Sequence, residues 1–333
     1  MAHKLARVAE HLRTGSVAAP VAEPCAAAAG GLEDLSGFLQ QVAPGDLTVP
    51  EWQVGCWKRE IITFSEHMYQ GKRFPLRDDT TFVVWLQTSS RCADIRIPVA
   101  HLGHPEADRE ERCPSSLKNA TLDELLVLAE ADGWTGRCRA AGSQPISMGA
   151  PASALTAVND WYNDDWSAGL PTDQKFPELG EMRRVGNSCL EFAPSGAYVE
   201  DWRLQPGSAG ISASLVLLAE DGQTPSGVVQ FVCSGNHACF TRGRPEGEID
   251  MDAYDGRPLP EHLGELLASG RRAEAERLLD MESSYAVRAN GAIATPYVIE
   301  ASTFPWLVGT PMPTVRTAST LQPDRTAEVS ATI

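Results

Sequence analysis

The clearest alternation of hydrophobic and polar positions lies within residues 80–98, TTFVVWLQTSSRCADIRIP. Residues 82–87 form an apolar run of strand-forming types, and the residues after them are small and polar, as a tight turn requires. Residues 92–97 then alternate, so that Asp94 and Arg96 share one face and apolar residues occupy the other. This pattern predicts a β-hairpin whose second strand has two unlike faces.

Similar patterns predict other elements, with short strands between them. Residues 228–244 indicate a second hairpin. Residues 121–132 indicate a helix, because Thr121 begins a capping box, apolar residues share one side and Gly133 follows as a stop signal. Residues 260–281 predict a longer helix with leucines on one face.

The order of these elements repeats along the chain. Three pairs of landmarks lie 145 to 147 residues apart: Trp57 and Trp202, Pro98 and Pro245, Trp161 and Trp306. The centres of the two predicted helices are separated by about the same number of residues. We therefore expect an internal duplication.

Many short strands joined by turns, with few helices, favour antiparallel sheets, and closing such a sheet removes its exposed edges. We expect a mainly β fold of two linked antiparallel β-barrels, each with one accessory helix. A barrel of about eight strands encloses side chains or one small ligand. The predicted segments are a flexible or helical lead at 1–48, a first barrel unit at 49–157, a second at 158–311 and a disordered tail at 312–333.

The acidic composition restricts the partners. The 333 residues carry a formal net charge of −16, and such a surface repels phosphate backbones and anionic lipids. We therefore expect no nucleic acid and no membrane as a partner, and no apolar run is long enough for a transmembrane helix. The eight cysteines are scattered without a CxxC pair, which favours reduced thiols and a cytoplasmic location. An organelle transit peptide is the less favoured alternative.

The first hairpin supplies one group of candidate ligand-binding residues: Trp85, Gln87, Arg91, Asp94 and Arg96. If the face with Asp94 and Arg96 lines a cavity, the planar arginine fork suits a polar or anionic group of a ligand. The alternative, which we favour, is an ion pair on the outer wall, although alternation alone does not decide which face is inside.

The second hairpin supplies a further group: Asn236, His237, Arg242 and Arg244. His237 titrates near neutrality, so it is the candidate general acid or base, paired with Glu200, Glu191 or Glu282. Arg242 would stabilise developing negative charge. The alternative, which we favour, is a solvent-exposed histidine in a turn.

Tyr198, Glu200 and Trp202 share one strand face by their i, i+2 spacing, with Glu191 on the strand before. A face with a carboxylate between two aromatic rings suits a cationic or hydroxylated ligand. A barrel seam without a ligand is an equal alternative.

No motif indicates a metal or another cofactor. The segment NDWYNDDW at 159–166 is rich in carboxylates but lacks EF-hand spacing, and we interpret it as a solvated linker between the halves. The histidines form no zinc-binding spacing. The chain also lacks the P-loop, GxGxxG and GxSxG patterns.

Four segments, WLQTSSRCADIRIP, YVEDWRL, LLDMESSY and IEASTFPW, together resemble a scattered family of uncharacterised proteins with two lipocalin-like (calycin) halves. The resemblance covers roughly residues 50–310 and implies two linked antiparallel barrels with small-ligand cavities. It implies no catalytic residues. The short glycine–tryptophan signature of secreted lipocalins is not found at the chain start, which argues against extracellular transport.

These observations lead to three functional hypotheses. The first is a protein that encloses a small, mainly apolar organic ligand in a barrel. The second is an isomerase, cyclase or lyase without a cofactor, in which a histidine–glutamate pair in the barrel acts as acid and base. The third is an interaction scaffold with filled barrels. The sequence does not distinguish among them, and it leaves the oligomeric state open.

Overall fold

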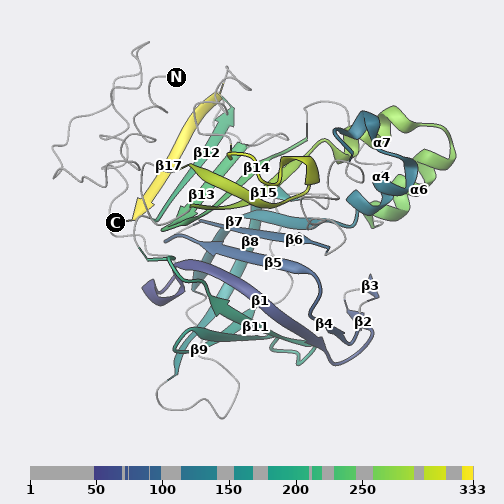
Figure 1. Ribbon diagram of the computed structural model, residues 1–333. Helices are drawn as coiled ribbons and strands as arrows, with labels where there is room; N and C mark the ends of the chain where they lie inside the picture. Colours follow the sequence, from purple (N-terminus) through teal and green to yellow (C-terminus); the bar gives the residue numbers. More distant parts are fainter. Residues whose placement is uncertain are drawn as a thin grey trace, which may run out of the picture.

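The structure is a computed structural model, and it describes residues 49–69, 72–73, 75–89, 91–98, 114–140, 154–167, 179–209, 212–219, 229–244, 258–288, 296–312 and 325–332. The predicted lead at 1–48 lies outside these residues. The described part is mainly β, as the pattern of short strands and turns predicted. It contains two large antiparallel sheets and one group of helices (Figure 1).

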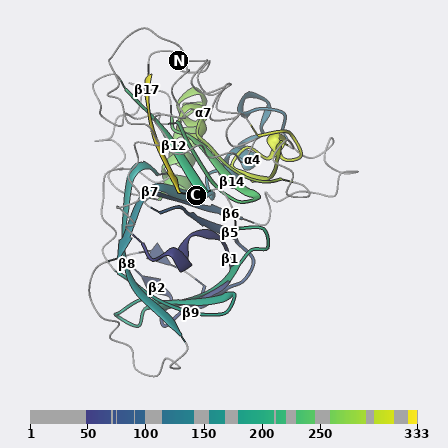
Figure 2. The same cartoon turned by 90° about the vertical axis from the view of Figure 1, so that its left-hand side faces the viewer.

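The first sheet has the strand order β11-β10-β9-β8-β7-β6-β5-β1-β4. Its strands are β1 (Gly55–Phe64), β4 (Arg77–Asp78), β5 (Phe82–Gln87), β6 (Arg91–Ile97), β7 (Asp132–Ala140), β8 (Leu155–Ser167), β9 (Gly180–Val185), β10 (Ser188–Phe192) and β11 (Tyr198–Leu204). The sheet curls until β11 pairs with β1, which also pairs with β5. Except for β4, the paired strands therefore form a ring around a common interior (Figure 2).

The second sheet has the strand order β16-β15-β14-β13-β12-β17. Its strands are β12 (Ser212–Ala219), β13 (Val229–Ser234), β14 (His237–Arg242), β15 (Glu282–Arg288), β16 (Tyr297–Ser302) and β17 (Arg325–Thr332). Among the described strands, β16 and β17 do not pair with each other, so the expectation of two closed barrels is not confirmed. Part of the expected disordered tail is instead β17, which pairs along β12.

The boundary between the first and the second sheet comes later in the chain than expected. β8 crosses the expected boundary after residue 157, and β9, β10 and β11 complete the first sheet. The second sheet begins only at Ser212. The segment 159–166 lies within β8, so its interpretation as a solvated linker is wrong.

The two hairpins support the expected duplication. Val83 pairs with Arg96 in the first hairpin, and Val229 pairs with Arg242 in the second. Both strands are thus related by the same shift of 146 residues. A helical segment and another strand follow each hairpin. The landmarks Trp57 and Trp202, in contrast, lie on paired strands of one sheet.

The helices are η1 (Glu51–Gln53), η3 (Leu117–Asn119), α4 (Leu122–Leu128), α6 (Leu259–Ala268), α7 (Arg272–Leu279) and η5 (Pro305–Leu307), and a small ribbon joins β2 (Met68–Tyr69) to β3 (Lys72–Arg73). The predicted capping box at Thr121 is confirmed. The helix after it ends at Leu128, so Gly133 is not its stop signal. The predicted long helix is divided into α6 and α7 at Gly270, whose φ is 75°. None of the described helices has the length and apolar character to cross a membrane.

The two halves pack against each other at two places. The outward-facing apolar residues of β1, β5 and β6 form one buried cluster with residues of β13, β14, β15 and β16. α4 packs with α6 and α7 in a second cluster beside the sheets (Figure 1). The described cysteines are all free and buried, and two of them, Cys56 and Cys239, belong to the first of these clusters.

Candidate functional site

The first hairpin turns its charged face toward the interior of the first sheet. Asp94 lies opposite Trp85 on β5 and Trp134 on β7, both of which belong to the buried interior cluster. The alternating residues, such as Ile95, pack beneath the second sheet. Both faces of β6 are therefore covered, and the favoured interpretation of Asp94 and Arg96 as an outer-wall ion pair is wrong.

Five tryptophans form the centre of the interior: Trp57, Trp85, Trp134, Trp161 and Trp202. The rings of Trp57 and Trp85 are stacked with their centroids 6.1 Å apart. The ring of Trp85 meets those of Trp161 and Trp202 edge-on, at 5.2 and 5.9 Å. Such offset and edge-on rings provide an apolar wall that suits flat organic groups.

One end of the interior is closed by η1, which precedes β1. Trp57 Nε1 donates to the carbonyl oxygen of Gln53 at 2.8 Å. The guanidinium of Arg184 on β9 donates to the carbonyl oxygen of Trp52 and lies 5.1 Å from the centroid of the Trp57 ring. At the opposite end of β1, Phe64 pairs with Tyr198. Glu200 is opposite Ile62, two residues before Phe64, and therefore lies toward that end.

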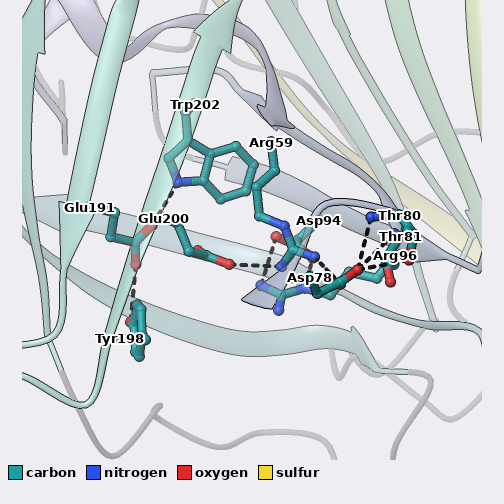
Figure 3. A network of polar contacts seen from close by, with 10 residues as sticks. All are labelled: Arg59, Asp78, Thr80, Thr81, Asp94, Arg96, Glu191, Tyr198, Glu200 and Trp202. Atoms are coloured by element: carbon teal, nitrogen blue, oxygen red, sulfur yellow. Dashed lines mark hydrogen bonds and ion pairs between the residues drawn. The ribbon is translucent and has the colours of Figure 1, made fainter. Parts of the chain in front are cut away.

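Arg59 on β1 joins two carboxylates in this region (Figure 3). Its guanidinium donates to Glu200 Oε1 and to Asp78 Oδ2, each at 2.9 Å. Burial opposes the ionisation of Asp78, but hydrogen bonds from Thr80 and Thr81 outweigh it and lower its pKa to about 2. Asp78 is therefore ionised at neutral pH and fixes Arg59 from the side of β4.

Arg96 and Asp94 form a second ion pair (Figure 3). Arg96 Nε donates to Asp94 Oδ1 at 2.7 Å, and Arg96 Nη2 donates to Asp94 Oδ2 at 3.3 Å. Burial raises the pKa of Asp94, and Arg96 opposes that rise. The Arg96 side chain is 33% exposed while that of Asp94 is 5% exposed. The arginine is thus the part of this pair that a molecule from solvent meets first.

Glu191 on β10 is held by two aromatic donors from β11 (Figure 3). Tyr198 Oη donates to Glu191 Oε1 and Trp202 Nε1 donates to Glu191 Oε2, both at 3.2 Å. Burial, with a further contribution from the neighbouring Glu200, raises the pKa of Glu191 to about 8. Near neutral pH this carboxyl group therefore holds a proton that it can donate.

Gly180 on β9 makes room for this carboxyl group. A Cβ atom at Gly180 would lie 2.9 Å from both Glu191 Oε1 and Trp161 Nε1. Gly180 is also opposite Asn159 on β8. The interior polar groups of β8, β9 and β10 are therefore close neighbours.

The structure does not pair His237 with a glutamate. His237 Nε2 lies 2.9 Å from the carbonyl oxygen of Pro206, and Nδ1 lies 2.8 Å from Tyr285 Oη. A carbonyl oxygen only accepts, so Nε2 carries the proton and Nδ1 accepts from the tyrosine. Burial lowers the pKa of His237, and the Pro206 carbonyl opposes that change. The expected exposed histidine is instead a buried one between the sheets.

The other predicted residues of the second hairpin also have structural partners. Arg242 donates to Asp280 Oδ1 at 2.6 Å, and Arg244 donates to the carbonyl oxygen of Leu278 at 2.6 Å, near the end of α7. Asn236 lies in the turn, where its backbone N–H donates to Gly207. Glu282 on β15 accepts from Ser284 Oγ at 2.8 Å. The structure does not gather these residues around the interior network of the first sheet.

The first hairpin's remaining candidates divide between the two faces. Gln87 is buried in the interior, where Oε1 accepts from Trp85 Nε1 at 3.0 Å and Nε2 donates to the Thr88 carbonyl oxygen at 2.8 Å. Arg91 lies on the face of β6 opposite Asp94, by strand alternation. Trp85, Gln87, Asp94, Arg96, Glu191, Tyr198, Glu200 and Trp202 thus share the interior, whereas Arg91 does not.

Sequence reasoning missed Arg59, Asp78 and the amide pair of Gln53 and Asn159. Arg59 lies two residues after Trp57, so strand alternation places both side chains on the same face of β1. This spacing is the signal from which Arg59 could have been predicted. Asp78 and Gln53 reach the interior from short elements without periodicity. Within the described ranges, no group of three or more histidine, cysteine, aspartate or glutamate residues has the arrangement of a metal site.

Comparison with known proteins gives no relative: no family model, no curated protein and no solved structure matches this chain.

Proposed function

We propose that the chain binds a small, mainly apolar organic molecule inside the first sheet, which acts as a lipocalin-like barrel. The observation that carries this proposal is a set of ion pairs beside five tryptophans, in which Arg59, Glu200 and Asp94 are buried and Arg96 is partly exposed. A buried ion pair is a weak source of stability, and apolar residues of similar volume would often stabilise a core better. Charges at Arg59, Glu200, Asp94 and Arg96 are therefore better explained by a guest that they orient than by folding.

The architecture supports the same proposal. A ring of about eight strands leaves an interior of the size of side chains or one small ligand. Since η1 closes one end, a ligand would enter from the end at which Arg96 is partly exposed.

The interior charges favour a neutral or cationic ligand over an anionic one. Two arginines, Arg59 and Arg96, face the carboxylates of Asp78, Asp94 and Glu200 and are bonded to them. Each arginine of this described network is already paired with a carboxylate, so a ligand carboxylate would add a negative charge without a matching cation. An apolar body with a hydrogen-bond acceptor near Arg96 fits this arrangement.

The test is a fluorescence titration with 6-propionyl-2-(dimethylamino)naphthalene, a neutral fluorescent ketone. The wild type is compared with the charge-neutral variant Asp94→Asn/Arg96→Gln. Its matched control is Asp201→Asn/Arg203→Gln, since Asp201 and Arg203 form an ion pair at the same spacing but are more exposed. We expect about tenfold weaker binding in the interior variant, from loss of a charged hydrogen bond, and wild-type binding in the control. Equal binding by both variants would contradict the proposal.

Glu191 favours a second candidate function, an isomerase, cyclase or lyase without a cofactor. Glu191 is poised to donate a proton, and the neighbouring Glu200 is held by Arg59. Two carboxyl groups with different environments are a recurrent basis of acid–base catalysis. In this proposal Glu191 takes the role first given to His237. Glu191→Gln should then abolish turnover of the bound molecule while retaining its binding, and retained turnover would exclude the assignment.

The third hypothesis, a scaffold with a filled barrel, is the outcome that remains if no neutral probe binds.

A further inference from the structure

An amide pair lies at the closed end of the first sheet. Gln53, in η1, donates from Nε2 to Oδ1 of Asn159 on β8 at 3.0 Å. Both residues are 0% exposed. This hydrogen bond joins η1, which closes one end of the interior, to strand β8 of the surrounding sheet, beside the tryptophans.

Each amide keeps one polar atom unused. Within the described part of the chain, Gln53 Oε1 and Asn159 Nδ2 have no hydrogen-bond partner. A buried donor or acceptor without a partner costs about 1–3 kcal/mol, so native interiors rarely leave one. Gln87 in the same interior, by contrast, uses both ends of its amide. The unused acceptor and donor can therefore each take a hydrogen bond from a group outside the chain, either a ligand or a water.

The surroundings restrict the shape and charge of that group. Trp57 Nε1 is bonded to the Gln53 carbonyl oxygen, and Trp161 follows Asn159 on the same face of β8. Gly180, opposite Asn159, adds no side chain to the wall. The faces and edges of such rings favour contact with a flat aromatic group. Since the two free atoms are amide atoms, the matching group is neutral, with one N–H donor and one carbonyl acceptor.

We propose that Gln53 and Asn159 form an inner subsite for an aromatic lactam or carboxamide edge. The ligand N–H donates to Gln53 Oε1, and the ligand carbonyl oxygen accepts from Asn159 Nδ2. This inference rests on the proposed function, because it names the class of ligand that the interior binds. It places the polar edge of the ligand at the closed end and its remaining body toward Arg96.

Calorimetric titration with three matched probes tests the inference: 2-quinolinone, 1-methyl-2-quinolinone and naphthalene. The first offers the donor and the acceptor, the second has the donor blocked, and the third has neither. We expect 2-quinolinone to bind at least about tenfold more tightly than its N-methyl analogue, since the analogue leaves Gln53 Oε1 unsatisfied. The double variant Gln53→Met/Asn159→Leu should abolish this preference, and Asp201→Asn/Arg203→Gln should keep it.

The outcomes separate this inference from the proposed function. Equal binding of 2-quinolinone and its N-methyl analogue would mean that the amide pair holds only water, and would overturn the subsite while leaving a ligand-binding interior. Binding of none of the three probes would overturn both. If the double variant does not fold, the comparison of the probes on the wild type still decides, because N-methylation changes the ligand alone.

Discussion

Individual side chains in the interior hold their charge states through specific neighbours. Glu191 accepts from Tyr198 and Trp202, neither of which is a cation, and burial favours its neutral form. Glu200 is also buried but is instead bonded to Arg59. These two neighbouring carboxyl groups thus have different partners, aromatic donors for Glu191 and an arginine for Glu200. Because the folded chain raises the pKa of Glu191, protonation of Glu191 is linked to the stability of the fold.

Replacement of Glu191 tests that link. Because its pKa rises from 4.5 to about 8 on folding, its contribution to stability is complete below about pH 4.5 and is lost as the pH rises through 8. Chemical unfolding at several pH values should show wild-type stability falling by up to about 1.4 kcal/mol per pH unit between pH 6 and 8 from this group. Glu191→Gln should remove that slope. The exposed Glu60→Gln is the control, and an unchanged slope in Glu191→Gln would contradict the assignment.

At the scale of elements, the strand after α4 fixes the position of Asp94. Gly133 on β7 has a φ of 152°, and a Cβ atom there would lie 2.6 Å from the carbonyl oxygen of Asp94. Backbone atoms cannot move aside as a flexible side chain can. The glycine therefore allows β7 to approach the backbone of β6 closely at Asp94.

Substituting two glycines distinguishes the cost of a steric contact with the backbone of β6 from the cost of a positive φ angle. Gly186, in the turn between β9 and β10, also has a positive φ, 60°, but a Cβ atom there would meet nothing within 4 Å. Gly186→Ala should cost about 1–2 kcal/mol of unfolding free energy, from the left-handed conformation alone. Gly133→Ala should cost more and should also weaken binding of the neutral ketone probe. Equal losses of stability, measured by urea unfolding, would show that the approach to Asp94 has no role.

The elements that depend on local chemistry were predicted, and those that depend on distant contacts were not. The capping box at Thr121 and both hairpins could be predicted from the sequence because their signals lie within a few residues of each other. Which face of β6 points into the interior could not be predicted, because the opposite face, with Ile95, is also buried, beneath the second sheet. His237 was misjudged because its partners, Pro206 and Tyr285, come from distant parts of the chain.

At the scale of the whole molecule, two hairpins with corresponding strand register lie in two different sheets. The first closes into a ring through the β1–β11 pairing, which joins residues more than a hundred positions apart. That pairing has no local signal, so the sequence pattern placed β11 in the second unit instead of the first. The second sheet remains open among the described strands and covers the outside of the ring. The proposed binding interior therefore belongs to one half, and the other half supports its wall.

Native mass spectrometry of the protein purified from its own host tests the binding proposal most directly. We predict one small molecule bound to each chain, released when the chain unfolds, neutral or cationic, and carrying an aromatic amide edge. Asp94→Asn/Arg96→Gln should reduce its occupancy, whereas Asp201→Asn/Arg203→Gln should retain it. A bare-chain mass for the wild type in every preparation, with no small molecule released on unfolding, would contradict the account.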